Sequence, residues 1–331
     1  MTSPSYTSAP TEMSAMTGHD RVETVESAFS WIVWAFAIAS GSLLLIITVI
    51  VTLDAMPAIQ EFGLSFLTGT IWSPIDDVYG ALPFIYGTLV TSIIALIFSV
   101  PLGLAVAIVT SEDFLPIYVR SPISFMVELI ASLPSVIIGL WGIFVFIPQM
   151  YPLQLWLNTY FGWFPLFRTV TVDGFEVPIS GPSYLVAGMI LAIMILPTIA
   201  AVSREVLLAI PRSLRSASMS LGATRWETIF KVMLPAAVSG ILGGIILALG
   251  RALGETLAVT MVIGNTPLLT TSIISPGYSI TSLLANQFAE AGTGLHLGSL
   301  MFLSLILFLI TLCVNVAAEW LVTLVGRRRV L

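Results

Sequence analysis

Long apolar stretches alternate with polar connections along the chain. A membrane-spanning helix needs about 20 mainly apolar residues, because each residue adds about 1.5 Å along the helix axis. Six stretches meet this length: 30–53, 83–109, 122–148, 183–203, 236–264 and 296–325. The pattern therefore predicts an all-α integral membrane protein with six transmembrane helices.

Composition agrees with this pattern and divides the chain into parts. Of the 331 residues, 57% are hydrophobic and 9% are charged, whereas soluble domains average about 25% charged residues. Residues 1–28 are rich in Ser, Thr and acids, which predicts a disordered cytoplasmic tail. The first apolar run is longer than a signal-peptide core and lacks a clear cleavage site, so we interpret it as a retained span. Residues 29–82 then hold the first helix and an outer loop, residues 83–325 a core of five helices, and residues 326–331 a basic cytoplasmic tail.

Basic residues favour one side of this topology. With a cytoplasmic N-terminus, the inner segments carry Arg21, Arg120, Arg204, Arg212, Arg215, Arg225, Lys231 and Arg327 to Arg329. The outer connections carry Arg168 as their one basic residue, and the acids Asp54, Glu61, Asp76, Asp77, Asp173, Glu176 and Glu290. Cytoplasmic loops of membrane proteins carry an excess of Lys and Arg. The distribution predicts a multi-pass protein of the cell inner (plasma) membrane with both termini in the cytoplasm.

Several kinds of site are excluded by residue counts. Cys313 is the one cysteine, so no internal disulfide can form, and with His19 and His296 as the two histidines a Cys/His metal cluster is also excluded. A membrane-embedded hydrolase is disfavoured because His296 is the one histidine near a span and no nucleophile motif accompanies it. A P-loop needs Gly-Lys-Ser/Thr, and the one lysine, Lys231, lies between Phe230 and Val232. We therefore expect no cofactor, no metal and no nucleic-acid partner, and we expect any ATP hydrolysis on a partner subunit.

Two charged residues lie inside the fifth apolar stretch. Arg251 and Glu255 are its ionisable residues, and a charge at the bilayer centre costs at least about 2.5–3.5 kcal/mol. Their spacing of four predicts that they share a helix face, which Gly244 and Ala248 would continue toward the cytoplasm. One interpretation is an ion pair that lowers the cost of insertion. The other is a polar patch on a translocation path, where arginine can bind an anion bidentately and the carboxylate can accept a proton.

The same stretch is rich in small residues. Gly240 and Gly244 are four residues apart, as are Gly250 and Gly254, which gives two GxxxG patterns. Such patterns allow two membrane helices to approach closely. We expect this helix to pack against a neighbour rather than to face lipid on all sides.

The connection at residues 204–235 is the longest of the inner connections and the most basic. It carries the signals of two short helices. Pro211 suits the first turn of one helix, and Gly222 suits the left-handed position that ends it. Thr224 and Glu227 form a capping box that begins a second helix, and Pro235 then marks the entry to the fifth span. Local chemistry leaves two interpretations open: an amphipathic hairpin on the membrane surface near anionic lipid, or a docking element for a cytoplasmic partner.

A family resemblance favours the docking element. SASMSLGATRWETIFKVMLP resembles the EAA loop of type I ABC transporter permeases, although Ser216 replaces the usual Glu, Ser218 the second Ala and Val232 the Ile. The resemblance implies that this loop docks as a coupling helix in a groove of an ATPase subunit. The residues implied in coupling are Ala217, Gly222, Thr224, Glu227, Leu234 and Pro235.

Two further stretches narrow the resemblance. ELIASLPSVIIGLWGIFVFIP, from Glu128, and GRALGETLAV, from Gly250, are similar to phosphate-specific permeases of the PstC type. This implies the type I ABC importer permease fold and a subunit that forms half of a phosphate pathway in membrane lipid. The implied partners are a second, PstA-type permease, a cytoplasmic ATPase dimer and an extracytoplasmic phosphate-binding protein. Arg251 and Glu255 would then be pathway residues.

Other transport functions remain as alternatives. The permease could carry another oxyanion, namely sulfate, molybdate or phosphonate. It could also be an ion-coupled secondary carrier, whose signature would be paired internal repeats with broken helices at the midplane. The sequence shows no such repeat, and a secondary carrier would leave the EAA spacing unexplained.

Overall fold

The computed structural model describes residues 13–327 except 113–115, 173–174 and 293. It divides into two units, one ending at Leu53 and one beginning at Asp54. Helix α1 (Met13–Phe62) supplies the described part of the first unit. The structure is thus helical from Met13, where the sequence predicts a disordered tail up to residue 28; residues 1–12 of that tail lie outside the described residues.

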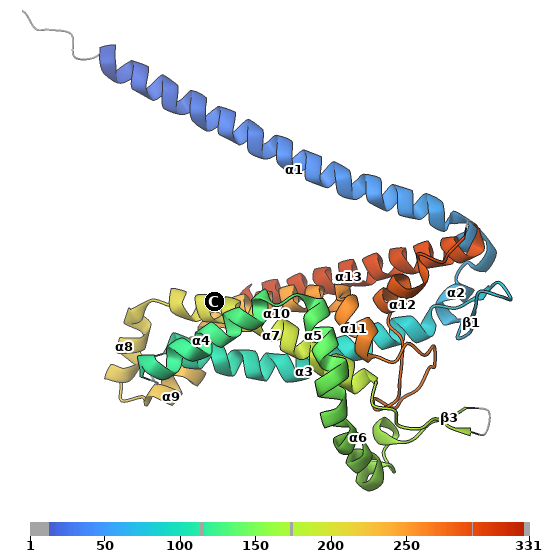
Figure 1. Cartoon of the computed structure of the whole chain (residues 1–331). Coiled ribbons are helices and arrows are strands. Elements are labelled where there is room, and N and C mark those ends of the chain that lie inside the picture. The colour runs from blue at the N-terminus through green and yellow to red at the C-terminus, as the bar shows by residue number, and fades with distance from the viewer. Residues whose placement is uncertain (1–12, 113–115, 173–174, 293, 328–331) are drawn as a thin grey trace, which may run out of the picture. The chain divides into compact units, whose positions relative to one another are not determined.

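The second unit is built almost entirely of helices (Figure 1). Its α-helices are α2 (Ser65–Thr68), α3 (Leu82–Ser111), α4 (Ile117–Ser132), α5 (Ser135–Trp141), α6 (Ile147–Phe161), α7 (Tyr184–Ala209), α8 (Arg212–Ser220), α9 (Arg225–Thr228), α10 (Leu234–Gly254), α11 (Leu257–Val262), α12 (Ile280–Gln287) and α13 (Leu295–Arg327). Two π-helical segments, η1 (Gly142–Phe146) and η3 (Ile229–Met233), and a 3₁₀ turn, η2 (Pro165–Phe167), join some of them. The strands form two antiparallel hairpins: β1 (Trp72–Ser73) with β2 (Val78–Tyr79), and β3 (Thr171–Val172) with β4 (Phe175–Glu176).

The core of this unit lies around α7. Ile190, Leu191 and Ile195 of α7 are almost fully buried, and α3 packs along this helix. Helix α10 also packs on α7, where a Cβ on Gly240 would lie 2.6 Å from Val206 Cγ2. A larger residue would therefore push the two helices apart, which confirms the close approach predicted from the spacing of Gly240 and Gly244. The second pattern, Gly250 and Gly254, shows no such approach among the described residues.

Among the described residues, six helical segments are long and apolar enough to cross a membrane, as predicted: 29–62, 82–111, 135–161, 184–209, 225–254 and 295–324. The predicted bounds of the third span, 122–148, are wrong. The chain turns extended at Leu133 (ψ 132°) and Pro134, so α4 ends before the span begins. The residue before a proline is disfavoured in the helical region, so the helix ends before Pro134 instead of continuing to residue 148.

The fifth span is also displaced from its predicted position. Helix α9 continues through η3 into α10, so the helix that contains the fifth span begins at Arg225, before the predicted residue 236. It ends at Gly254, because Glu255 adopts an extended conformation (ψ 126°) before the short helix α11 begins. The run 236–264 is therefore two helices rather than one.

The second unit has two chemically different ends (Figure 1). Helices α8 and α9, which carry Arg212 and Arg225, lie at one end of the long helices. The β1–β2 hairpin, with Asp76 and Asp77 in its turn, lies at the other end. The basic loop and this acidic turn are thus separated along the bundle.

Candidate functional site

Helices α8 and α9 form a hairpin (residues 212–235, the α8–α9 hairpin) whose turn depends on one glycine. Gly222 has a φ of +87°. Its N–H donates to Met219 O at 3.0 Å, and the Ala223 N–H donates to Ser218 O at 3.3 Å. These are the two bonds of a Schellman motif, which satisfies the last carbonyls of a helix. The predicted left-handed position is confirmed, although Pro211 caps α8 from just outside rather than lying in its first turn.

The second helix of the hairpin begins at the predicted capping box. The Glu227 N–H donates to Thr224 Oγ1 at 3.2 Å, and the Thr224 N–H donates to Glu227 Oε2 at 3.0 Å. Lys231 Nζ lies 3.0 Å from the other carboxylate oxygen of Glu227. Leu234 and Pro235 then begin α10 directly after η3. The hairpin is therefore joined to the fifth span without a flexible connection.

Two serines stand where the family pattern has other residues. Ser218 Oγ lies 3.0 Å from Thr228 Oγ1, so this serine joins α8 to α9. Ser216 Oγ donates to Arg212 O within its own helix, at 3.2 Å. Ser216, like its neighbour Ala217, is exposed.

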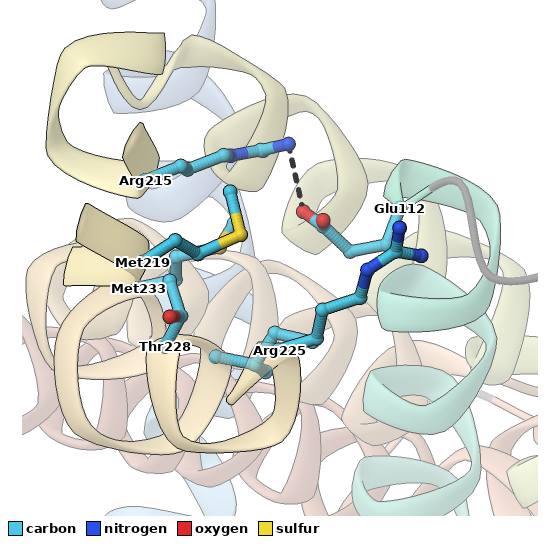
Figure 2. Close-up of a pocket in the computed structure, with 7 residues that line it drawn as sticks. Glu112, Arg215, Met219, Arg225, Thr228 and Met233 are labelled. Carbon is cyan, nitrogen blue, oxygen red and sulfur yellow. Dashed lines mark ion pairs between the residues drawn. The ribbon is translucent and has the colours of Figure 1, made fainter. Parts of the chain in front are cut away.

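The hairpin encloses a cavity with the end of α3 (Figure 2). The cavity has a volume of about 220 Å³ and is lined by Glu112, Arg215, Met219, Arg225, Thr228, Ile229 and Met233. Figure 2 shows Arg215 reaching from α8 to Glu112, where Arg215 Nη1 lies 2.9 Å from Glu112 Oε1. The sequence did not identify Glu112, because acids in a short connection after an apolar run, here Glu112 and Asp113, resemble any loop residues.

The hairpin also exposes large apolar side chains. Leu221, at its turn, is 90% exposed, and Met219 is 47% exposed. Trp226 and Phe230 stack on each other, with ring centroids 5.9 Å apart, and both are more than half exposed. An apolar group of this kind with arginines around it is typical of a surface that another protein covers.

Arg251 and Glu255 are not arranged as the sequence predicts. Helix α10 ends between them, so they do not share a helix face. No ion pair joins them in the part of the chain that the structure describes. Gly244 and Ala248 are buried, and a Cβ on Gly244 would lie 2.9 Å from Val202 Cγ1 of α7, so these two residues do not continue a polar patch.

The break between α10 and α11 nevertheless brings polar groups together. Arg251 is exposed in the last turn of α10, where a cation is favoured by the helix dipole. Glu255 Oε1 accepts from the Ala258 N–H at 3.4 Å, and the Glu255 carbonyl accepts from Thr281 Oγ1 at 2.8 Å. Glu255 is therefore held by α11 and α12 rather than by Arg251, and the guanidinium remains available to another anion.

Comparison with known proteins identifies the architecture to which these sites belong. Residues 99–330 match the family model described as binding-protein-dependent transport system inner membrane component. The match covers well over half of the chain. The chain belongs to this family.

The permease has curated relatives along most of its length. A phosphate transport system permease protein PstC from Pasteurella multocida is 43% identical over 277 residues, covering 83% of this chain and 85% of the relative. A protein of the same name from Haemophilus influenzae is 40% identical over 304 residues, covering 90% of this chain and 93% of the relative. A subunit of a bacterial ABC transporter involved in the import of the acidic polysaccharide alginate has a TM-score of 0.53 at 17% identity, covering 92% of this chain and 98% of that one. This structural likeness supports the type I ABC importer permease fold.

The permease carries a further polar residue near the end of α10, at Gly250, that the sequence analysis missed. Asn315 of α13 is exposed, and its Oδ1 lies 4.0 Å from the position of a Cβ on Gly250. Glu319 follows one turn later and is also exposed. An exposed amide in an apolar span has no hydrogen-bond partner in lipid, so this strip of α13 faces water or another protein. The sequence does contain a signal for these residues, because Asn315 and Glu319 are two polar residues four apart in the sixth apolar run.

His296 has a packing role in the permease. Its ring stacks on Tyr79, with centroids 5.8 Å apart, and its Nε2 lies 3.2 Å from Gln287 Oε1. Trp72 Nε1 donates to the same oxygen at 2.9 Å. Burial and then the Asp77 carboxylate raise the pKa of Tyr79 to about 12, so its hydroxyl stays neutral. These residues close the end of the bundle opposite the α8–α9 hairpin.

Proposed function

We propose that the chain is the transmembrane permease subunit of an ATP-driven phosphate importer and forms half of its translocation pathway. The observation that carries this proposal is the identity of about 40% with proteins named phosphate transport system permease protein PstC, along more than four-fifths of the chain. The GRALGET stretch, which holds Arg251 and Glu255, is among the residues on which the resemblance rests. Sulfate, molybdate and phosphonate are less favoured cargoes.

The proposed complex contains other subunits. A second, PstA-type permease completes the pathway, and an extracytoplasmic binding protein delivers phosphate. A cytoplasmic ATPase dimer hydrolyses ATP, because this chain lacks a P-loop. The termini and the α8–α9 hairpin face the cytoplasm, as the arginine distribution predicts. We also propose that the chain divides after residues 28, 82 and 325. The four parts are an N-terminal tail, a first helix with an outer loop, a core of five helices and a basic C-terminal tail.

The α8–α9 hairpin is the proposed coupling element. Its exposed apolar side chains, such as Leu221, suit a groove on the ATPase. Its capping box and Schellman motif keep it rigid. Because α9 continues into α10, a displacement of the hairpin reaches the fifth span directly. ATP-driven closing of the ATPase pair would thus switch the pathway between its inward-facing and outward-facing states.

Arg251 and Glu255 are the proposed pathway residues. The guanidinium neutralises a passing phosphate, and the Glu255 carboxylate accepts its proton. A pathway must release its cargo as well as admit it, so the site has to be weak. We add Asn315, whose amide oxygen lies 4.0 Å from the position of a Cβ on Gly250, the residue before Arg251. Asn315→Leu should lower phosphate uptake without lowering assembly, and unchanged uptake would remove Asn315 from the pathway.

Copurification tests this function against other classes of transporter. The tagged permease should bring an ATPase and a second permease with it from the membrane. A secondary carrier or an embedded hydrolase would bring neither. Isolation of the chain as an active transporter that needs no ATPase would contradict the proposal.

A further inference from the structure

The α8–α9 hairpin is tied to the end of α3 as well as to its own neighbours in sequence. Arg215 of α8 makes the 2.9 Å ion pair with Glu112, and its Nη2 also donates to Leu207 O at 3.1 Å. Glu112 caps α3, while Leu207 lies in the last turn of α7. One guanidinium therefore holds the ends of two long helices.

The position suits a cation for a physical reason. The last carbonyls of a helix lack partners within the helix and carry partial negative charge. Arg215 donates to one such carbonyl on α7, that of Leu207, which also accepts from the Ile210 N–H at 3.4 Å, and it meets a carboxylate at the end of α3. The two side chains are 20% and 17% exposed, so water screens the pair less than it would a surface pair.

Arg215 also borders open space. It lines the cavity of about 220 Å³ and a second cavity of about 490 Å³, to which Ser111, Ser216 and Met219 also contribute. The ion pair therefore lies beside cavities rather than within a closely packed core. A pair that joins two helices can carry a displacement from one helix to the other, since rigid elements and ion pairs are the parts through which sites are coupled.

We propose that the Glu112–Arg215 pair, here called the α3–α8 link, transmits movement of the α8–α9 hairpin to α3. The inference rests on the proposed function. Movement of the hairpin reaches the fifth span through α9, and the α3–α8 link carries it to the second span as well. Because α3 packs along α7, the central helices then move together. Glu112 and Arg215 are positioning residues, since neither is placed on the pathway.

Glu112→Gln is the decisive variant. Glu112 belongs to α3 and not to the hairpin, so its loss leaves the surface for the ATPase intact. It also removes the negative charge with which Arg225, which lines the same cavity, would otherwise pair in place of Arg215. Glu205→Gln is the matched control, because Glu205 is an exposed carboxylate of α7 without an ion pair among the described residues.

The experiment measures phosphate moved per ATP hydrolysed by the reconstituted complex, and ATPase recovered with the permease. Glu112→Gln should copurify with the ATPase as the wild type does, yet move at least about five-fold less phosphate per ATP, a ratio typical of coupling between sites. Adding Arg215→Gln should lower this ratio no further, because the two residues act as one unit. Glu205→Gln should match the wild type.

The outcomes separate the two proposals. Absence of phosphate transport by the wild-type complex overturns the proposed function itself. A transporting wild type with an equal ratio in Glu112→Gln overturns the α3–α8 link alone. Loss of ATPase copurification in Glu112→Gln also overturns it, since the residue would then act in assembly.

Discussion

Replacing Gly222 should weaken the coupling of ATP hydrolysis to transport. The loss should be larger for residues that tolerate a positive φ less well. Its φ is +87°, and a Cβ built there meets no atom within 4 Å in the described part of the chain. Steric contact with neighbours therefore adds nothing to the effect. A left-handed conformation costs an L-residue about 1–2 kcal/mol. Asparagine tolerates this region better than alanine does, and a β-branched residue tolerates it worst.

This cost is large enough to change which hairpin conformation dominates. A difference of 1–2 kcal/mol changes the ratio of two states by about 5- to 30-fold. The two Schellman bonds from Gly222 and Ala223 would be lost in the alternative state. Phosphate-stimulated ATPase activity should therefore fall in the order Gly, Asn, Ala, Val at residue 222, while insertion into the membrane stays normal.

The assay is ATPase activity of the reconstituted complex, with and without the phosphate-loaded binding protein. Membrane levels of each variant provide the control for insertion. Gly222→Asn should keep most of the stimulation, and Gly222→Val should lose at least about five-fold. Equal losses in the Asn and Ala variants would refute the role of φ. Full stimulation of a well-inserted Val variant would show that the turn does not couple ATP hydrolysis to transport.

Two further predictions concern the pathway and the topology. Arg251→Lys keeps the charge but loses the bidentate fork, so it should lower labelled-phosphate uptake, and Arg251→Gln should abolish uptake while assembly with the ATPase persists. Glu255→Gln should slow uptake, because phosphate loses its proton acceptor and is retained by Arg251; full uptake by Arg251→Leu with Glu255→Leu would remove both residues from the pathway. In a Cys313→Ser background, which removes the exposed native thiol, a cysteine at Ser216 should be labelled from the cytoplasm and one at Thr171 from outside. Labelling of both from the same side would disprove the six-span topology.

The sequence predicted those parts of the fold that depend on local chemistry. The number of spans, the turn at Gly222 and the capping box at Thr224 all follow from composition or from bonds between residues close in sequence. Helix ends inside apolar runs do not. The break at Glu255 lies between two apolar segments, and it is stabilised by Thr281, 26 residues away. The periodicity of the run 236–264 could not reveal this contact.

The candidate site was predictable to a similar extent. The hairpin residues were identified because their spacing matches a known family, whereas the partners of that hairpin depend on tertiary contacts. Glu112 lies more than 100 residues from Arg215, and nothing in either local sequence pairs them. Arg251 and Glu255 were recognised by their charge in an apolar run. Their relation was predicted wrongly because a spacing of four implies a shared face only if the helix continues.

The central claim is that this permease moves phosphate at the expense of ATP hydrolysed by a partner. The most direct test is uptake of labelled phosphate by proteoliposomes that contain this permease, its partner permease, the ATPase and the binding protein. The account predicts uptake that requires ATP and this chain, and that excess sulfate or molybdate does not reduce. Uptake that proceeds without ATP, or that sulfate or molybdate abolishes, would contradict it.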